Sequence, residues 1–240
     1  GAFDRMVEIV LEKYFTQPNY WRVDGAPYFS IFDLTILLDS FGGVNGAADA
    51  LADFRRRTRA AGHRDLHLNL VLWHPAILQG DESLPISPEI VRRLGFDSVT
   101  SYVWILHAAM ESFPSMPYLR ALEKMLAFTR GMEARFPSLT YFPNVTMGWD
   151  ASPRTVQTER FENVGYPFMS TLSGNTPTNF RRALTEFKDW LRTRPSSERV
   201  LMLNAWNEWT EGSYLEPDAR NGMAYLEAVR EVFGKEEQSR

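Results

Sequence analysis

The stretch from Arg199 to Pro217, R-V-L-M-L-N-A-W-N-E-W-T-E-G-S-Y-L-E-P, joins a short apolar run to a polar and aromatic segment. The apolar run, residues 200–203, has the length and composition of a fully buried strand. Glu208 and Glu211 follow it among tryptophan and tyrosine side chains, and Gly212 breaks any regular continuation. Burial raises the pKa of a carboxyl group, so a fold that needed only stability would avoid this arrangement. The stretch is therefore the first place to look for chemistry.

Strands and helices alternate along the rest of the chain. Apolar residues at helical spacing predict helices at about 3–15, 46–61, 88–94, 118–136, 177–191 and 222–233. Short apolar or alternating runs predict strands at 27–34, 66–73, 98–104, 140–147 and 200–203, with a further short one at 168–170. This alternation predicts an α/β fold with a parallel sheet, either an open doubly wound sheet or part of a (β/α)₈ barrel. The 240 residues are expected to form a single domain, 1–240.

Composition excludes several classes of function. The net charge is −4 and no Lys/Arg-rich block occurs, which argues against a nucleic-acid partner. The absence of cysteine excludes disulfides, thiolate metal sites and a cysteine nucleophile. No apolar run reaches the ~18 residues of a membrane span, and residues 1–4 show no signal-peptide pattern. These features predict a protein without a membrane span and leave its compartment open.

Aromatic residues gather where the predicted strands end. Five of the seven tryptophans lie there, and the residues concerned are Trp73 with His74, Tyr102 with Trp104, Trp149 with Asp150, and Trp206 with Trp209. In both parallel architectures the carboxyl ends of the strands carry the active site. Indole faces suit the C–H faces of sugars, although any single tryptophan at a strand end is equally explained by core packing. Five of them at one edge favour a saccharide-binding cleft.

Glu208 and Glu211 are the candidate catalytic pair. Three residues of extended chain reach at most ~10 Å, so the two side chains can flank one bond. Two carboxyl groups in an aromatic, partly dry site have their pKa values pushed apart, which supplies one acid and one base for glycosidic cleavage. The spacing does not choose between a retaining separation of ~5 Å and an inverting one of ~6.5–9.5 Å. The alternative is a solvated turn with ordinary surface glutamates.

Other polar residues are candidates for substrate binding. Asp33 and Asp150 are placed to bond sugar hydroxyls, although Asp33 is equally suited to capping the next helix. Glu216 either lines the site or pairs with the last helix. The remaining candidate contacts are Trp206, Asn207, Trp209 and Tyr214. The histidines lack the spacing of metal ligands and no strand is followed by a phosphate-binding loop, so no metal and no cofactor are expected.

Two segments resemble a known family. The motif N-E-W-T-E-G-S-Y-L-E-P, residues 207–217, resembles glycoside hydrolase family 99, and still more the bacterial family-99-like group often labelled glycosyltransferases of polysaccharide gene clusters. The run P-N-Y-W-R-V-D-G-A-P-Y-F-S-I, residues 18–31, resembles the segment before the fourth barrel strand of these proteins. The resemblance implies that this chain supplies about the last five βα units of a (β/α)₈ barrel. A further segment or chain would then complete the barrel.

The resemblance also implies a reaction. Family 99 enzymes are retaining and metal-independent, and they cleave α-mannoside-type linkages, often internal ones. By resemblance, Glu208 would deprotonate the sugar 2-hydroxyl, which attacks the anomeric carbon to give an anhydro-sugar. Glu211 would protonate the leaving oxygen and later activate water. Because Thr210 and residues 213–215 differ from the family pattern, the sugar in the oligo- or polysaccharide substrate stays open. A glycosyltransferase and a non-catalytic carbohydrate-binding protein are the alternatives.

Overall fold

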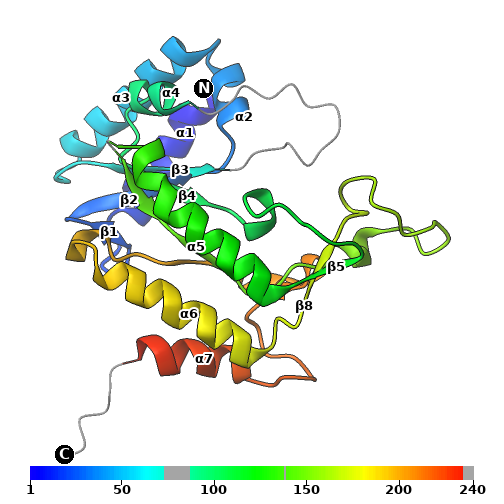
Figure 1. Cartoon of the computed structure of the whole chain (residues 1–240). Helices are drawn as coiled ribbons and strands as arrows, with labels where there is room; N and C mark the ends of the chain where they lie inside the picture. Colours follow the sequence, from blue (N-terminus) through cyan, green and yellow to red (C-terminus); the bar gives the residue numbers. More distant parts are fainter. Residues whose placement is uncertain (73–86, 138, 235–240) are drawn as a thin grey trace, which may run out of the picture. The chain divides into compact units, whose positions relative to one another are not determined.

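The computed structural model describes residues 1–72, 87–137 and 139–234 (Figure 1). The described residues divide into two compact units. The first comprises 1–72, 87–100 and 133–141 without 138, and the second comprises 101–132 and 142–234. Both units contain helices and strands, so the mixed α/β class agrees with the sequence prediction. Trp73 and His74, two of the predicted cleft residues, lie outside the described residues.

The first unit is built on a sheet with the strand order β1-β2-β3-β4-β6. These strands are β1 (Arg22–Val23), β2 (Ala26–Ile31), β3 (His67–Leu72), β4 (Ser98–Ser101) and β6 (Thr140–Phe142). The helices are α1 (Ala2–Ile9), which continues as a π-helical segment (Val10–Tyr14), α2 (Leu34–Ser40), α3 (Val44–Ala60) and α4 (Pro88–Arg93). β2 pairs in parallel with β3, and β1 pairs antiparallel with β2. The apolar face of α3 buries Leu51 and Phe54, each 1% exposed, in the core.

The predicted end of the first strand, 27–34, is wrong. The strand stops at Ile31 rather than at Leu34, and Leu34 opens helix α2, which the sequence pattern did not reveal. The reason is the side chain of Asp33, whose Oδ1 accepts a hydrogen bond of 2.9 Å from the backbone N–H of Ile36. An aspartate in this position satisfies an amide that the helix itself leaves unpaired. Asp33 therefore takes the capping role that was the alternative to sugar binding.

The second unit contains three short pairs of strands. Its strands are β5 (Ser115–Pro117), β7 (Asn144–Thr146), β8 (Thr171–Ser173), β9 (Met202–Asn204), β10 (Asn207–Glu208) and β11 (Ser213–Tyr214). β5 pairs in parallel with β8 and β7 in parallel with β9, whereas β10 and β11 are antiparallel. Its helices are α5 (Tyr118–Arg135), α6 (Pro177–Arg192) and α7 (Ala224–Phe233). The parallel pairs with intervening helices are consistent with part of a (β/α)₈ barrel.

Several predicted boundaries in this region need correction. The strand predicted over 140–147 consists of two pieces, β6 and β7, separated by Pro143, which has no N–H to contribute to a ladder. The strand predicted over 98–104 ends at Ser101, and the one predicted at 168–170 lies at Thr171–Ser173. The last helix buries Tyr225, Ala228 and Val232. Met223 and Phe233, two apolar residues of the helix predicted at 222–233, are 51% and 40% exposed.

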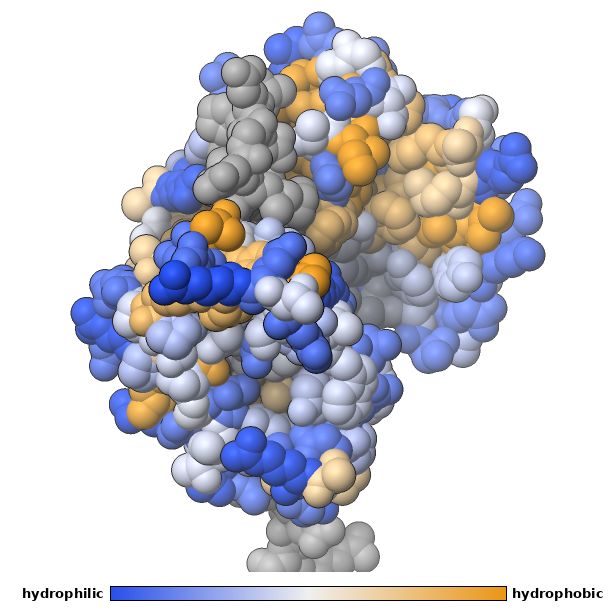
Figure 2. Space-filling view, turned by 90° about the vertical axis from the view of Figure 1, so that its right-hand side faces the viewer, coloured by the Kyte–Doolittle hydropathy of each residue, from blue (hydrophilic) through white to orange (hydrophobic). Residues whose placement is uncertain are grey.

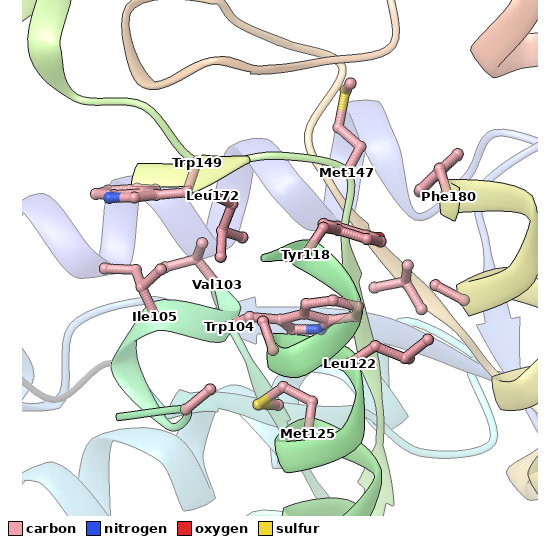
Figure 3. Close-up of a cluster of buried hydrophobic side chains, with 14 of the residues drawn as sticks. Val103, Trp104, Ile105, Tyr118, Leu122, Met125, Met147, Trp149, Leu172 and Phe180 are labelled. Atoms are coloured by element: carbon pink, nitrogen blue, oxygen red, sulfur yellow. The ribbon is translucent and has the colours of Figure 1, made fainter. Parts of the chain in front are cut away.

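Trp104 belongs to the hydrophobic core of the second unit (Figure 3). Its side chain is 0% exposed, its ring stacks on Tyr118 with centroids 5.1 Å apart, and its Nε1 donates to the carbonyl of Asn144 over 2.8 Å. Trp149, also in Figure 3, is 3% exposed. A ring enclosed in this way has no free face for a sugar, so the prediction of stacking is wrong for both residues. Each is instead the core residue that any single strand-end tryptophan was equally expected to be.

The surface in Figure 2 intersperses hydrophilic residues with smaller groups of apolar ones. Large apolar side chains that are more than half exposed include Ile36 at 65% and Trp206 at 55%. Scattered exposed apolar residues are normal for a folded protein, so only those beside polar chemistry call for explanation. Within the described ranges, no helix is both long enough and apolar enough to cross a bilayer.

Candidate active site

The motif at residues 207–217 folds as a small hairpin directly after strand β9. β10 and β11 pair antiparallel, with Glu208 opposite Ser213, and a single 3₁₀ turn (Trp209–Glu211) lies between them. Gly212 closes the turn with φ +60°, a left-handed conformation that favours glycine. The buried hydroxyl of Ser213 lies 2.8 Å from both the backbone oxygen and the side-chain Oδ1 of Asn204 at the end of β9. The hairpin is thus fixed to the preceding strand.

The two glutamates occupy different environments. The side chain of Glu211 is 8% exposed, whereas that of Glu208 is 34% exposed. Burial is the largest influence on Glu211 and raises its pKa, and the negative charge of Glu208 raises it further. The cation of Arg154 and the hydroxyls of Tyr166 and Tyr102 oppose this effect, but the pKa remains above its ordinary value. Glu211 therefore retains its proton to higher pH than an ordinary glutamate does.

One arginine contacts both glutamates. Arg154 lies in a 3₁₀ turn (Ser152–Arg154), with its Nη2 2.7 Å from Oε1 of Glu208 and its Nη1 3.1 Å from Oε1 of Glu211. Its Nε donates to Oγ1 of Thr210 over 2.8 Å. The hydroxyl of Tyr166 accepts a hydrogen bond from Nη1 of Arg154 and donates to Oε1 of Glu211 over 3.2 Å. Arg154 and Tyr166 were not among the predicted site residues, because they come from a poorly periodic segment without a motif.

Asp150 connects this arginine turn to the hairpin. Its backbone N–H donates to the carbonyl of Glu211 over 2.7 Å, and its Oδ1 accepts from the N–H of Ser152 over 2.9 Å. A β-carbon added to Gly212 would lie 2.9 Å from Cβ of Asp150, so glycine is needed there for packing as well as for conformation. Asp150 was predicted to bind sugar hydroxyls. The structure shows a positioning contact for it and leaves sugar binding a prediction.

The exposed aromatic residues of the predicted cleft lie on the hairpin or, for Trp206, directly before it. Trp209 stacks on Tyr214 with ring centroids 3.8 Å apart and an angle of 17°, and its Nε1 donates to Oε2 of Glu216 over 2.6 Å. Trp206 and Trp209 are 55% and 44% exposed, so both rings are accessible. Glu216 bonds Trp209, rather than the last helix that was its other predicted partner.

The remaining predicted site residues are distributed as follows. Tyr102 belongs with the glutamates, because burial and the charges of Glu211 and Glu208 raise its pKa to about 12. Asn207 lies in β10 and is exposed, whereas Asp33 lies in the first unit. Among the residues that the structure describes, no three His, Asp or Glu side chains gather in a way that could hold a metal ion.

The chain is similar in sequence to a protein family and to curated proteins. A sequence profile of the family described as Glycosyltransferase WbsX matches residues 3–229. Two curated relatives from strains of Xanthomonas campestris pv. campestris, both named "Uncharacterized protein WxcX", are 29% identical to the chain over 245 residues. The match covers 92% of this chain and 29% of each relative, so the chain spans less than a third of their length.

Solved structures with a similar fold include two relevant proteins. A "Glycoside hydrolase-like protein" aligns with a TM-score of 0.62 and 16% identity, over 97% of this chain and 60% of that one. The GH99 endo-α-mannosidase from Bacteroides thetaiotaomicron, in complex with bis-tris-propane, aligns with a TM-score of 0.54 and 14% identity, over 96% of this chain and 63% of that one. The predicted resemblance to family-99-like proteins is confirmed.

Proposed function

The chain belongs to the WbsX glycosyltransferase family, and from that premise we propose that it carries the reacting carboxyl groups of an enzyme acting on glycosidic bonds. The substrate is an oligo- or polysaccharide. Glu208 and Glu211 are the proposed catalytic pair, and the exposed rings of Trp206 and Trp209 are the proposed sugar contacts. A further segment or chain, absent from these 240 residues, is proposed to complete the barrel around the cleft.

The unequal burial of the two glutamates is the observation that carries this proposal. A general acid must hold a proton until the leaving oxygen needs it, which requires a carboxyl group with a raised pKa. Glu211 meets this requirement, since burial raises its pKa. Glu208 is more exposed and is paired to a cation, which suits a carboxylate that accepts a proton. Ordinary surface glutamates in a solvated turn would not show this difference.

The proposed reaction is retaining hydrolysis. Glu208 takes the proton of the sugar 2-hydroxyl, and the 2-oxygen of the sugar forms a bond to the anomeric carbon. The bond from that carbon to the leaving oxygen breaks, its electron pair goes to the leaving oxygen, and Glu211 supplies the proton. In the second step Glu211 takes a proton from water, and the water oxygen bonds to the anomeric carbon. The bond from that carbon to the 2-oxygen breaks, its electron pair goes to the 2-oxygen, and Glu208 returns its proton there. Both glutamates and the configuration are restored.

The test compares Glu208→Gln and Glu211→Gln on two kinds of substrate. With a polysaccharide, both variants are expected to lose about 10²–10⁴-fold in turnover, the usual contribution of a positioned acid or base. With disaccharide fluorides of gluco-, manno- and galacto-configuration, Glu211→Gln is expected to retain far more of the first step, measured as a burst of released fluoride, because fluoride leaves without protonation. Glu227→Gln on the exposed side of α7 is the matched control. Undiminished polysaccharide turnover in Glu211→Gln would contradict the assignment.

Glycosyl transfer is the second candidate, and the description of the family favours it. The two activities share the same bond to the anomeric carbon and differ in whether water or a sugar hydroxyl accepts the glycosyl group. Calorimetric titration with a panel of nucleotide-activated sugars separates them. Saturable binding of one donor, abolished by Glu208→Gln, would favour the transferase.

A further inference from the structure

We propose that Arg154 is the positioning residue of this site: it engages Oε1 of both glutamates and so leaves Oε2 of each to react. The proposal rests on the proposed function for the reaction itself. The contacts that carry it are independent of any substrate. It assigns a role to a residue from outside the motif, at a sequence distance of 54 from Glu208.

The guanidinium of Arg154 is held in a fixed orientation. Its Nε, Nη1 and Nη2 each contact a different side chain, namely Thr210, Glu211 and Glu208. Its Cζ also lies 5.8 Å from the ring centroid of Tyr166. The planar guanidinium fixes the directions of its N–H groups, so contacts on three nitrogens define the relative position of both carboxylates. A lysine, with a single point charge, would not reproduce this arrangement.

The contacts also distinguish the two oxygens of Glu211. Its Oε1 forms an ion pair with Nη1 of Arg154 at 3.1 Å and accepts a hydrogen bond from the hydroxyl of Tyr166 over 3.2 Å. A proton on Oε1 would point toward these donors, so the acid proton is best placed on Oε2. Oε2 is buried and has no hydrogen-bond partner of good geometry among the residues that the structure describes, although the phenol of Tyr102 acts on the same carboxyl group. Such an atom requires a partner, and the leaving oxygen of a substrate supplies one.

Glu208 is held in the same way. Its Oε1 lies 2.7 Å from Nη2 of Arg154 and accepts from Oγ1 of Thr210 over 3.2 Å. Charge-assisted contact on one oxygen orients the carboxylate and leaves Oε2 for the hydroxyl whose proton it takes. Both glutamates therefore bind the same cation through one oxygen and act through the other.

The pH dependence of Glu211 follows from the groups that face it. These are Arg154 and Glu208, with the phenols of Tyr166 and Tyr102. Arg154 is the cation that lowers the pKa of Glu211 against the effect of burial. Replacing it with an uncharged side chain is therefore expected to raise that pKa further. In an active enzyme, the alkaline limb of the rate profile, where the acid loses its proton, would move to higher pH.

Two measurements on the full chain test the proposal with Arg154→Met and Arg154→Lys. The first is carbon-13 NMR titration of the glutamate side-chain carboxyls, assigned with Glu208→Gln and Glu211→Gln. The Glu211 titration is expected to move to higher pH in Arg154→Met and by less in Arg154→Lys. The second is turnover, expected to fall about 100-fold in kcat with little change in KM, as for a misplaced catalytic group.

The control is Arg160→Met, because Arg160 lies in the same segment, is 88% exposed and pairs with Glu162 over 3.1 Å. It is expected to change neither measurement, and Tyr166→Phe is expected to raise the pKa of Glu211 less than Arg154→Met does. An unmoved Glu211 titration in folded Arg154→Met overturns the proposal. If that titration moves while no polysaccharide or glycosyl fluoride is turned over by the wild type, the positioning role stands and the proposed function fails.

Discussion

At the scale of single residues, the structure separates side chains that look alike in the sequence. Glu208 and Glu211 differ in burial, and Trp104 and Trp209 differ by 44% in exposure. Burial depends on what the rest of the chain brings to each position, which local composition does not encode. The pair of glutamates could therefore be identified from the sequence, whereas the difference in their burial could be seen only in the folded structure.

The raised pKa of Glu211 predicts a pH-dependent stability. Well below pH 4.5, the ordinary pKa of a glutamate, the carboxyl is protonated in both the folded and the unfolded chain. As the pH rises, the unfolded state ionises first while the buried group keeps its proton, so the free energy of unfolding falls until the pH passes the folded pKa. Glu211→Gln lacks this dependence. The melting temperature of the variant minus that of the wild type is expected to increase between pH 4 and pH 7.

Calorimetric scans across that range check the prediction, with Glu227→Gln as the exposed control. A difference in melting temperature that stays constant with pH would show that Glu211 titrates alike in the folded and unfolded states.

Truncation of Trp104 and truncation of Trp209 are expected to lower the free energy of unfolding by different amounts. Trp104→Ala is expected to lower the free energy of unfolding by about 3–5 kcal/mol, because it empties a core position and removes the bond to the Asn144 carbonyl. Trp209→Ala is expected to cost only about 0.5–1.5 kcal/mol, the value of its stacking on Tyr214. Urea unfolding measures both. Because only Trp209 is a proposed sugar contact, Trp209→Ala is expected to weaken polysaccharide binding while the protein stays folded. Trp104→Ala is expected to act on stability instead.

At the scale of elements, local signals predicted the helix starts that a capping residue and a proline mark together. Ser87 before Pro88 and Thr176 before Pro177 begin α4 and α6 as expected, because capping depends on neighbouring residues. Arg154 was missed because its contacts with the hairpin are long-range and no motif marks them. The hairpin of β10 and β11 was predicted only as a break at Gly212.

Gly212 supports a prediction about that hairpin. Gly212→Ala is expected to lower stability by more than the ~1–2 kcal/mol of a left-handed non-glycine residue, because its β-carbon would also meet Asp150 at 2.9 Å. Gly222 is the matched control, since its φ is +56° and no atom lies within 4 Å of an added β-carbon. The comparison of the two variants by urea unfolding isolates the steric contribution. Equal losses would mean that the approach of Asp150 to the turn is unimportant.

At the scale of the whole molecule, alternation of strands and helices predicted the α/β class. It overestimated strand lengths, because apolar residues next to a strand were counted with it, as at Leu34 and Trp104. The number of βα units stays a prediction, and so does the single domain. Where the structure describes the chain, however, the boundaries between the two compact units fall within β4, α5 and β6 rather than in linkers.

This placement of the boundaries predicts how the chain unfolds. Domain boundaries normally fall in exposed linkers that few contacts cross, whereas each crossing within the described residues interrupts a regular element. The described residues are therefore expected to unfold in one cooperative transition. Phe54→Ala in the first unit and Trp104→Ala in the second, at positions 1% and 0% exposed, should then both lower the same urea midpoint. Far-ultraviolet circular dichroism and tryptophan fluorescence should give coincident curves in each variant. Two separated transitions, each moved by only one variant, would show that the units are independent domains and would contradict the single domain predicted from the sequence.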